Sequence, residues 1–284
     1  MNWYPAPGKL NLFLHVVGRR DDGYHLLQTV FRLIERGDRV GIGLRADGEL
    51  RRVRADPRIA AEDDLCLRAA RLLRDHARLR AGGDSGRLGA DIDLEKVLPI
   101  GGGLGGGSSD AATVLLVLNR LWGLKLLRDE LMGLGAQLGA DVPVFVFGES
   151  ALGEGIGERL TALSLAPSWY LVLVPQVSVS TKEIFANAAL TRNTKPLKIP
   201  PFFSGQGRND LEAVVAARYP EVAAHLAWLR QRCPAARMTG SGACVFAEFA
   251  QEAEARAFQS QLPETMQGFV TRSLERHPLH DWAE

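Results

Sequence analysis

The spacing of apolar and polar positions predicts that the first third of the chain is mostly strands. Apolar residues alternate with polar ones in stretches that turn-forming residues separate, which is the period of a half-buried strand. The predicted strands are residues 9–17, 26–34, 39–44 and 90–97. Residues 64–77 instead have a helical period, with Leu65, Ala69, Leu72 and Leu73 on one side.

The remaining two thirds combine helices and strands without a regular alternation. Helices are predicted over 111–121, 127–138, 210–218, 220–233 and 253–261, and strands over 169–175, within 236–249 and over 268–272. Strands outside a βαβ order favour an α+β fold over a doubly wound sheet. A composition shift over the glycine-rich residues 148–157 suggests two domains, 1–153 and 154–284, that meet near Gly153.

One segment of the second half has no predicted element. Residues 191–207 form a long polar stretch with three prolines and no apolar period. A loop of this length in a compact domain is usually mobile or functional.

Composition places the chain among ordinary globular proteins. Its 284 residues are 46% hydrophobic and 24% charged, with a net charge of +1. This balance argues against nucleic acid as a partner, and no apolar run reaches the length of a membrane span. Cys66, Cys233 and Cys244 are isolated, the N-terminus lacks a signal-peptide layout, and the histidines show no metal spacing. We therefore expect reduced thiols in a cytoplasmic protein.

The segment over residues 99–109 is the strongest chemical signal in the sequence. Six of its eleven residues are glycine, a strand is predicted before it and an apolar helix after it. Glycine at this density costs conformational entropy, which a chain accepts where backbone approaches a ligand or φ is positive. Free N–H groups at a helix N-terminus favour an anion, and we expect a phosphate chain. Ser108 and Ser109 are predicted to cap the helix.

Other interpretations of the glycine loop fit less well. A flexible linker would separate two complete units, whereas this segment continues into a helix. No Gly-Lys-Ser/Thr follows, which excludes a Walker A loop. The loop fits G-x-G-x-x-G at Gly101, Gly103 and Gly106, but the acids that a dinucleotide site needs, Asp129 and Glu130, lie in a predicted helix. The other motifs of protein kinases are absent from the sequence.

Three segments resemble the motifs of the GHMP kinases, named for galactose, homoserine, mevalonate and phosphomevalonate. These segments are residues 5–12 (PAPGKLNL), 99–109 (PIGGGLGGGSS) and 237–244 (RMTGSGAC). Within that superfamily, residues 9–14, 22–25 and 138–145 are similar to the 4-diphosphocytidyl-2-C-methyl-D-erythritol kinases. The resemblance runs from about residue 3 to about residue 280. It implies an N-terminal domain like domain 2 of ribosomal protein S5, a C-terminal GHMP kinase domain, and an active site in the cleft between them.

The resemblance implies that ATP phosphorylates the 2-hydroxyl of 4-diphosphocytidyl-2-C-methyl-D-erythritol. Asp141 stands at the position of the catalytic aspartate and Lys9 at that of its lysine partner. A carboxylate can orient the hydroxyl or take its proton, and an ammonium can neutralise charge on the phosphoryl group. The alternatives are a helix N-cap for Asp141 and an exposed strand lysine for Lys9. Mg²⁺ is expected with ATP, and the sequence identifies no protein ligand for it.

On the nucleotide side, the resemblance adds two residues to the glycine loop. The family often has asparagine where this chain has Asp64, and Asp64 could simply cap the first helix. Lys96 resembles a nucleotide-side lysine, although a solvated surface lysine is the ordinary alternative. The residues expected at ATP are Asp64, Lys96, Pro99, Ile100, Gly101, Gly102, Gly103, Leu104, Gly105, Gly106, Gly107, Ser108 and Ser109.

On the acceptor side, the resemblance implies that Tyr24 and His25 hold the cytosine and that Phe185 closes its other face. An aromatic ring and an imidazole suit a flat, polar base. The alternatives are a half-buried turn aromatic for Tyr24 and plain core for Phe185. Ala186 stands where the family often has lysine. The other residues expected near the methylerythritol and its phosphates are Asn11, Thr181, Thr239, Gly240, Ser241 and Gly242.

Two other functions remain open at this stage. The chain could phosphorylate another small alcohol, such as mevalonate or homoserine, but the Tyr24–His25 pair argues against substrates that carry no base. It could also be a ligand-binding protein without catalysis, which the intact Lys9, Asp141 and glycine loop argue against. The expected partners are small-molecule substrates alone, and the expected assembly is a monomer or weak homodimer.

Overall fold

The computed structural model describes residues 1–54, 62–80, 87–198 and 207–283. The strands are β1 (Asn2–Arg19), β2 (His25–Arg45), β3 (Leu50–Arg52), β4 (Gly89–Glu95), β5 (Ala151–Gly155), β6 (Arg159–Ala162), β7 (Trp169–Leu173), β8 (Arg237–Met238), β9 (Val245–Phe249) and β10 (Gly268–Arg272). The helices are α1 (Leu65–Arg80), α2 (Gly106–Leu121), α3 (Arg128–Leu138), α4 (Val142–Phe147), α5 (Thr181–Ala186), α6 (Glu212–Arg218), α7 (Pro220–Arg230), α8 (Glu252–Gln259) and the 3₁₀ helix η1 (His280–Trp282).

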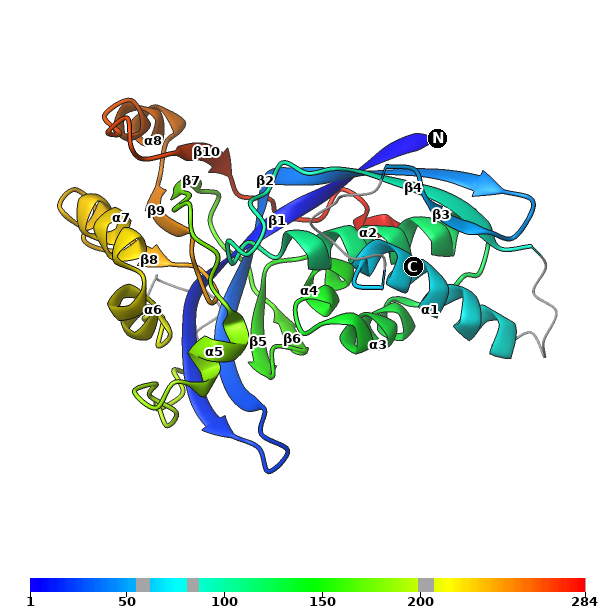
Figure 1. The fold of residues 1–284 in the computed structure, drawn as a ribbon, viewed down its shortest axis with the longest axis horizontal. Helices are drawn as coiled ribbons and strands as arrows, with labels where there is room; N and C mark the ends of the chain where they lie inside the picture. The colour runs from blue at the N-terminus through cyan, green and yellow to red at the C-terminus, as the bar shows by residue number, and fades with distance from the viewer. Residues whose placement is uncertain (55–61, 81–86, 199–206, 284) are drawn as a thin grey trace.

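These elements form two sheets, and the predicted α+β class is confirmed. The first sheet has the order β3-β4-β2-β5-β6, with β1 paired to β2, and the second has the order β10-β7-β9-β8. Helices α1 to α4 lie against the first sheet, and α6 to α8 lie with the second (Figure 1).

A long hairpin of β1 and β2 connects the two parts of the molecule (Figure 1). The predicted strands 26–34 and 39–44 are one continuous strand, β2, which pairs antiparallel with β1 along most of its length. Tyr4 and Ala6 of β1 belong to the core around α1 to α4, while Leu14 and Val16 belong to the core of the second part. One hairpin therefore sets the relative position of both cores.

Helix α2 begins earlier than predicted. Its N-cap is Gly105, at a φ of +71°, and no side chain makes a capping bond there. Ser109 is already inside the helix, because its N–H donates to the Gly105 carbonyl at 2.9 Å. The prediction that Ser108 and Ser109 cap the helix is therefore wrong, since a left-handed glycine starts it.

Strand pairing supports a boundary between the two parts that lies later than Gly153. Gly153 lies within β5, and both β5 and β6 belong to the first sheet. We propose that the two parts divide within residues 163–168, between β6 and β7. The last residues return to the first part, where Leu279 and Ala283 join its core.

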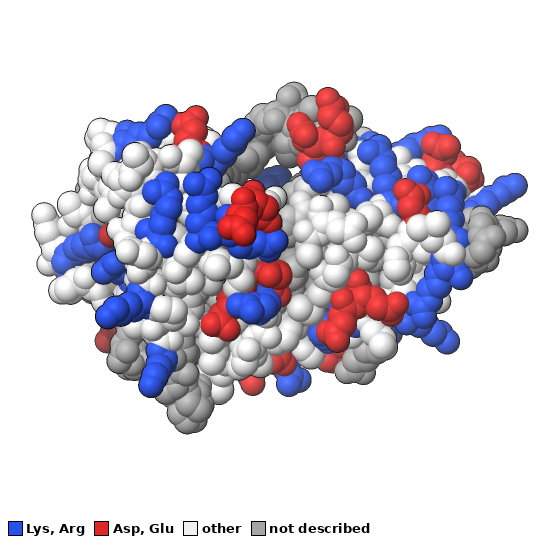
Figure 2. Space-filling view, turned by 90° about the horizontal axis from the view of Figure 1, so that it is seen from below, with Lys and Arg blue, Asp and Glu red and all other residues white. Residues whose placement is uncertain are grey.

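The loop predicted over 191–207 falls only partly within the described residues. Residues 191–198 are neither helix nor strand, and residues 199–206 lie outside the described part of the chain. Among the described helices, none has the length and apolar character needed to cross a membrane. Lys and Arg side chains are interspersed with Asp and Glu on the face shown in Figure 2.

Candidate active site

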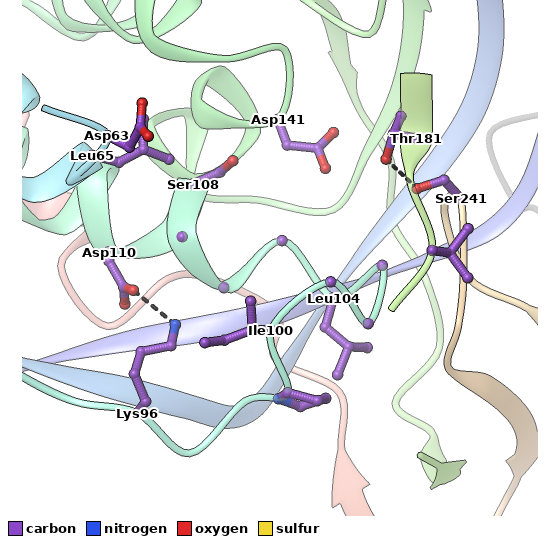
Figure 3. A pocket seen from close by; sticks show the side chains of 18 of the residues that line it. Asp63, Leu65, Lys96, Ile100, Leu104, Ser108, Asp110, Asp141, Thr181 and Ser241 are labelled. Carbon is purple, nitrogen blue, oxygen red and sulfur yellow. Dashed lines mark hydrogen bonds and ion pairs between the residues drawn. The ribbon is translucent and has the colours of Figure 1, made fainter. Parts of the chain in front are cut away.

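Two adjoining cavities lie beside the glycine loop. The first, of about 390 Å³, is lined by the loop, the start of α1, Lys96 and Asp110. The second, of about 770 Å³, is lined by β1, the β1–β2 turn and α5. The residues on the walls of both are Gly103, Ser108, Asp141, Thr181 and Ser241. Two ligands that filled these cavities would therefore meet next to Asp141, whose place on the wall of the first cavity is shown in Figure 3.

The glycine loop is a fixed structure and not a linker. Gly101, Gly103 and Gly105 all have positive φ, between +70° and +76°. A Cβ on Gly103 would lie 2.2 Å from the Thr239 carbonyl oxygen, and one on Gly105 would lie 2.9 Å from the Phe145 ring. The loop ends at the N-terminus of α2, whose first N–H groups have no partner within the helix. This arrangement suits a phosphate chain.

Lys9 and Asp141 form an ion pair at the junction of the cavities. The Lys9 side chain is only 2% exposed, and its Nζ lies 3.2 Å from Asp141 Oδ2. The same Nζ donates to Asn11 Oδ1 at 2.6 Å and to the Gly103 carbonyl at 2.9 Å. The expected alternative for Lys9, an exposed strand lysine, is therefore wrong.

Asp141 occupies the N-cap position of α4 without acting as a cap. Its side chain makes no capping bond and is 36% exposed. In Figure 3 the carboxylate points toward the side of the cavity where Thr181 and Ser241 lie. Asp141 therefore stands at the N-cap position that the alternative predicted, but its side chain does not cap the helix.

Lys96 is held at the edge of the first cavity by two carboxylates. Its Nζ bonds to Asp38 and lies 2.9 Å from Asp110 Oδ2. Burial raises the pKa of Asp110 to about 7, although the Lys96 ammonium acts in the opposite direction. Asp38 also accepts N–H bonds from Val97 and Leu98, at 2.5 and 2.7 Å. The alternative of a solvated surface lysine is wrong for Lys96.

Asp64 lines the first cavity and also caps α1. Its Oδ1 accepts the N–H groups of Cys66 and Leu67, at 2.9 and 3.1 Å. Its Oδ2 lies 3.4 Å from Arg52. The capping alternative is confirmed, and it leaves Asp64 on the wall expected for the nucleotide.

Most of the predicted acceptor-side residues line the second cavity, whereas Gly242 lines only the first. Tyr24 is 61% exposed, and the His25 ring stacks on Phe185 with centroids 4.9 Å apart. Thr181 and Ser241 share a hydrogen bond of 2.6 Å, and both lie at the junction (Figure 3). Phe185 is only partly buried against the core of the second part, so the plain-core alternative does not describe it.

Two predicted residues lie outside the walls of both cavities. Ser109 has a fully buried side chain. Thr239 is also buried; its hydroxyl accepts the Asn11 N–H at 3.0 Å and donates to the Gly103 carbonyl at 3.3 Å. Thr239 therefore supports the glycine loop from behind. Sequence reasoning gave no role to Asp38 or Arg192, because no motif surrounds either residue.

Comparison with known proteins identifies relatives along the whole chain. The family models for the GHMP kinases N terminal domain and the GHMP kinases C terminal match residues 64–149 and 197–268. A protein of Nitrosospira multiformis named 4-diphosphocytidyl-2-C-methyl-D-erythritol kinase is 60% identical over 282 residues, 99% of this chain and 94% of its own. A protein of the same name from Thiobacillus denitrificans is also 60% identical, over 98% of both chains.

Solved structures agree with these relatives. A crystal structure of 4-(cytidine 5'-diphospho)-2C-methyl-D-erythritol kinase superposes with a TM-score of 0.79 at 31% identity, covering 96% of this chain and 99% of that one. A mevalonate kinase has a TM-score of 0.68 at 15% identity, over 97% of this chain and all of that one. At such low identity the second likeness concerns the fold alone.

Proposed function

The chain belongs to the GHMP kinases, among the 4-diphosphocytidyl-2-C-methyl-D-erythritol kinases, and we propose that it phosphorylates the 2-hydroxyl of that diphosphocytidyl alcohol with ATP. It is an ATP-dependent phosphotransferase with an alcohol acceptor. The product would enter isoprenoid precursor biosynthesis by the route that does not use mevalonate.

The observation that carries the proposal is the position of Asp141. Its carboxylate lies on the wall that both cavities share, 3.2 Å from a buried ammonium. In-line phosphoryl transfer needs a hydroxyl and a γ-phosphate held together beside groups that can handle a proton and neutralise charge. The junction of the cavities offers both kinds of group at one point.

Each residue at the junction has a distinct task in this proposal. Asp141 orients the acceptor hydroxyl and is placed to take its proton. The Lys9 ammonium and the backbone N–H groups at the start of α2 stabilise negative charge on the phosphoryl group as it moves. Because Lys9 also bonds Asn11 and Gly103, its ammonium keeps one position in the site.

Mg²⁺ would enter the first cavity as part of the ATP substrate. Among the described residues, no three Asp, Glu, His or Cys side chains group together as a metal site. Phosphate oxygens and water would therefore supply most of its ligands, as Mg²⁺ commonly requires with nucleotides. Ser108 and Asp141 are two of the four side chains with oxygen atoms on the shared wall, and either could complete its shell; the other two, Thr181 and Ser241, are hydrogen-bonded to each other.

The second cavity is proposed to hold the diphosphocytidyl alcohol. Tyr24 would stack on the cytosine next to the paired rings of His25 and Phe185. Asn11, Thr181, Gly240 and Ser241 would face the alcohol and the diphosphate. Ala186 removes the cationic contact that the family often has at this position.

An ADP-release assay over a panel of alcohols tests the proposed reaction. Turnover is expected with the diphosphocytidyl alcohol and not with mevalonate or homoserine. Turnover with either of these instead would support another GHMP kinase activity, and ATP binding without turnover on any alcohol would support a ligand-binding role. We also propose a cytoplasmic location, because the three cysteines are free thiols, as is usual in a reducing compartment. The proposed assembly is a monomer or weak homodimer, which sedimentation velocity would test.

A further inference from the structure

Arg192 connects the loop after α5 to His25 on the β1–β2 hairpin. Its Nε donates to His25 Nε2 at 3.1 Å. Its two terminal nitrogens donate to three backbone carbonyls, those of Phe185, Asn187 and Leu190, at 2.7 to 3.0 Å. Four of the five N–H groups of the guanidinium are thus in use, and the side chain is held in one orientation.

This contact determines where the His25 proton lies. A guanidinium can only donate hydrogen bonds, so His25 Nε2 must accept with its lone pair. In a neutral imidazole the single proton is then on Nδ1. Burial, followed by the charges of Arg192 and Arg19, lowers the pKa of His25 and keeps the ring neutral near pH 7. Across the described residues, Nδ1 has no hydrogen-bond partner, and His25 lines the second cavity.

We propose that Arg192 is a positioning residue that fixes His25 as the Nδ1–H form, so that the second cavity selects cytosine over uracil. This inference rests on the proposed function for its ligand. The N3 atom of cytosine is an acceptor, which matches an N–H donor. The N3 atom of uracil carries a hydrogen, so the same donor would face another donor. An unmatched donor in a desolvated site is costly, which makes it an effective means of rejection.

The proton position can be measured directly on the intact protein. Nitrogen-15 NMR of the histidine rings separates protonated from bare nitrogens, and Phe185→Leu or His25→Gln spectra assign the His25 signals. We expect Nδ1–H in the native protein and a shift toward the Nε2–H form in Arg192→Met. Arg19→Met is the matched control, because it removes a nearby positive charge and leaves the bond to Nε2. It should keep the Nδ1–H form.

Base preference is the functional readout, with CDP and UDP as probes in calorimetry. The native protein should bind CDP at least about 10-fold more tightly than UDP, the scale of one mismatched hydrogen bond. Arg192→Met should reduce this ratio below about 3-fold, while ATP affinity stays unchanged. If Arg192 only stiffened the loop, both nucleotides would weaken equally and the ratio would persist.

Three results would overturn the inference. They are an Nε2–H ring in the native protein, a full CDP preference in folded Arg192→Met, and an equal weakening of CDP and UDP. The first needs no variant, so the test survives a variant that fails to fold. Failure of the native protein to bind either nucleotide would contradict the proposed function itself, whereas CDP binding by an Nε2–H ring would contradict this inference alone.

Discussion

Replacing Asp141 with asparagine separates catalysis from folding more cleanly than any other single change at the site. Asparagine has nearly the same shape, can occupy the N-cap position, and keeps an oxygen that can accept from Lys9. It loses the negative charge and the ability to take a proton. Because Asp141 makes no capping bond in the native protein, the substitution removes no bond from α4.

The cost in stability follows from the ion pair. Two unit charges 3.2 Å apart interact by about 1.3 kcal/mol in water and about 5 kcal/mol at an effective dielectric constant of 20. The Asp141 side chain is 36% exposed, so solvent screens the pair toward the lower figure. We expect a loss of about 1–2 kcal/mol, which lowers Tm by about 2–6 °C in a chain of this size.

The cost in rate should be much larger. A positioned acid or base contributes about 10²-fold or more, so the single-turnover rate should fall by at least that factor. The assay mixes enzyme with saturating ATP and diphosphocytidyl alcohol and follows one turnover, alongside a melting curve. Asp129→Asn is the control, because it removes an exposed carboxylate in the first turn of α3, outside both cavities. It should keep the native rate.

A folded Asp141→Asn enzyme whose chemical step is within about 3-fold of native would refute the assignment. Catalysis would then rest on positioning by the loop and on the Lys9 ammonium. A loss of both rate and folding would instead mean that the ion pair holds the site together, and the melting curve distinguishes these cases.

Three further changes test the rest of the site. Gly107→Val should weaken ATP binding at least about 10-fold with the fold intact, because a Cβ there meets only Leu65 at 3.4 Å; Gly133→Val in α3 should leave ATP affinity unchanged. Tyr24→Ala should weaken binding of the diphosphocytidyl alcohol by about 1–3 kcal/mol, because stacking on the base is lost. If the variant weakened ATP binding instead, the assignment of the two ligands to the two cavities would be reversed. The stability of the native protein should fall from pH 3.8 to about 7, because Asp110 keeps a proton in the folded state that the unfolded chain releases. The Asp110→Asn variant should therefore become more stable relative to the native protein as the pH rises through that range. A stability difference between the two proteins that does not change with pH would contradict this.

The sequence predicted the fold best where one period dominated a long segment. Strand β10 lies where it was predicted, and α3 begins within one residue of its predicted start, because one face of each packs on a core. Strand β5 was missed because its glycines suggested a turn. A Cβ on Gly153 would lie 2.5 Å from the Phe31 ring, so the glycine there accommodates an aromatic side chain of the neighbouring strand.

The site was predictable only where a motif carried it. Resemblance identified Lys9 and Asp141, although nothing in their spacing shows that their side chains meet. Asp38 and Arg192 were not predictable, since their partners Lys96 and His25 lie 58 and 167 positions away along the chain. A lone arginine in a loop without periodicity gives no local signal for a contact that the fold alone creates.

The three segments of the family resemblance meet at one backbone atom, the carbonyl oxygen of Gly103. It accepts from Lys9 Nζ at 2.9 Å and from the Thr239 hydroxyl at 3.3 Å, and that hydroxyl accepts the Asn11 N–H. The positive φ of Gly103, +76°, sets the direction of this carbonyl, and the 2.2 Å approach of a Cβ to the Thr239 backbone leaves no space for a side chain. Glycine is therefore required at position 103 because the backbone geometry there directs the carbonyl that positions the Lys9 ammonium. At Gly107 a Cβ would meet only Leu65, at 3.4 Å, so we propose that this is the position where a missing side chain serves the ligand.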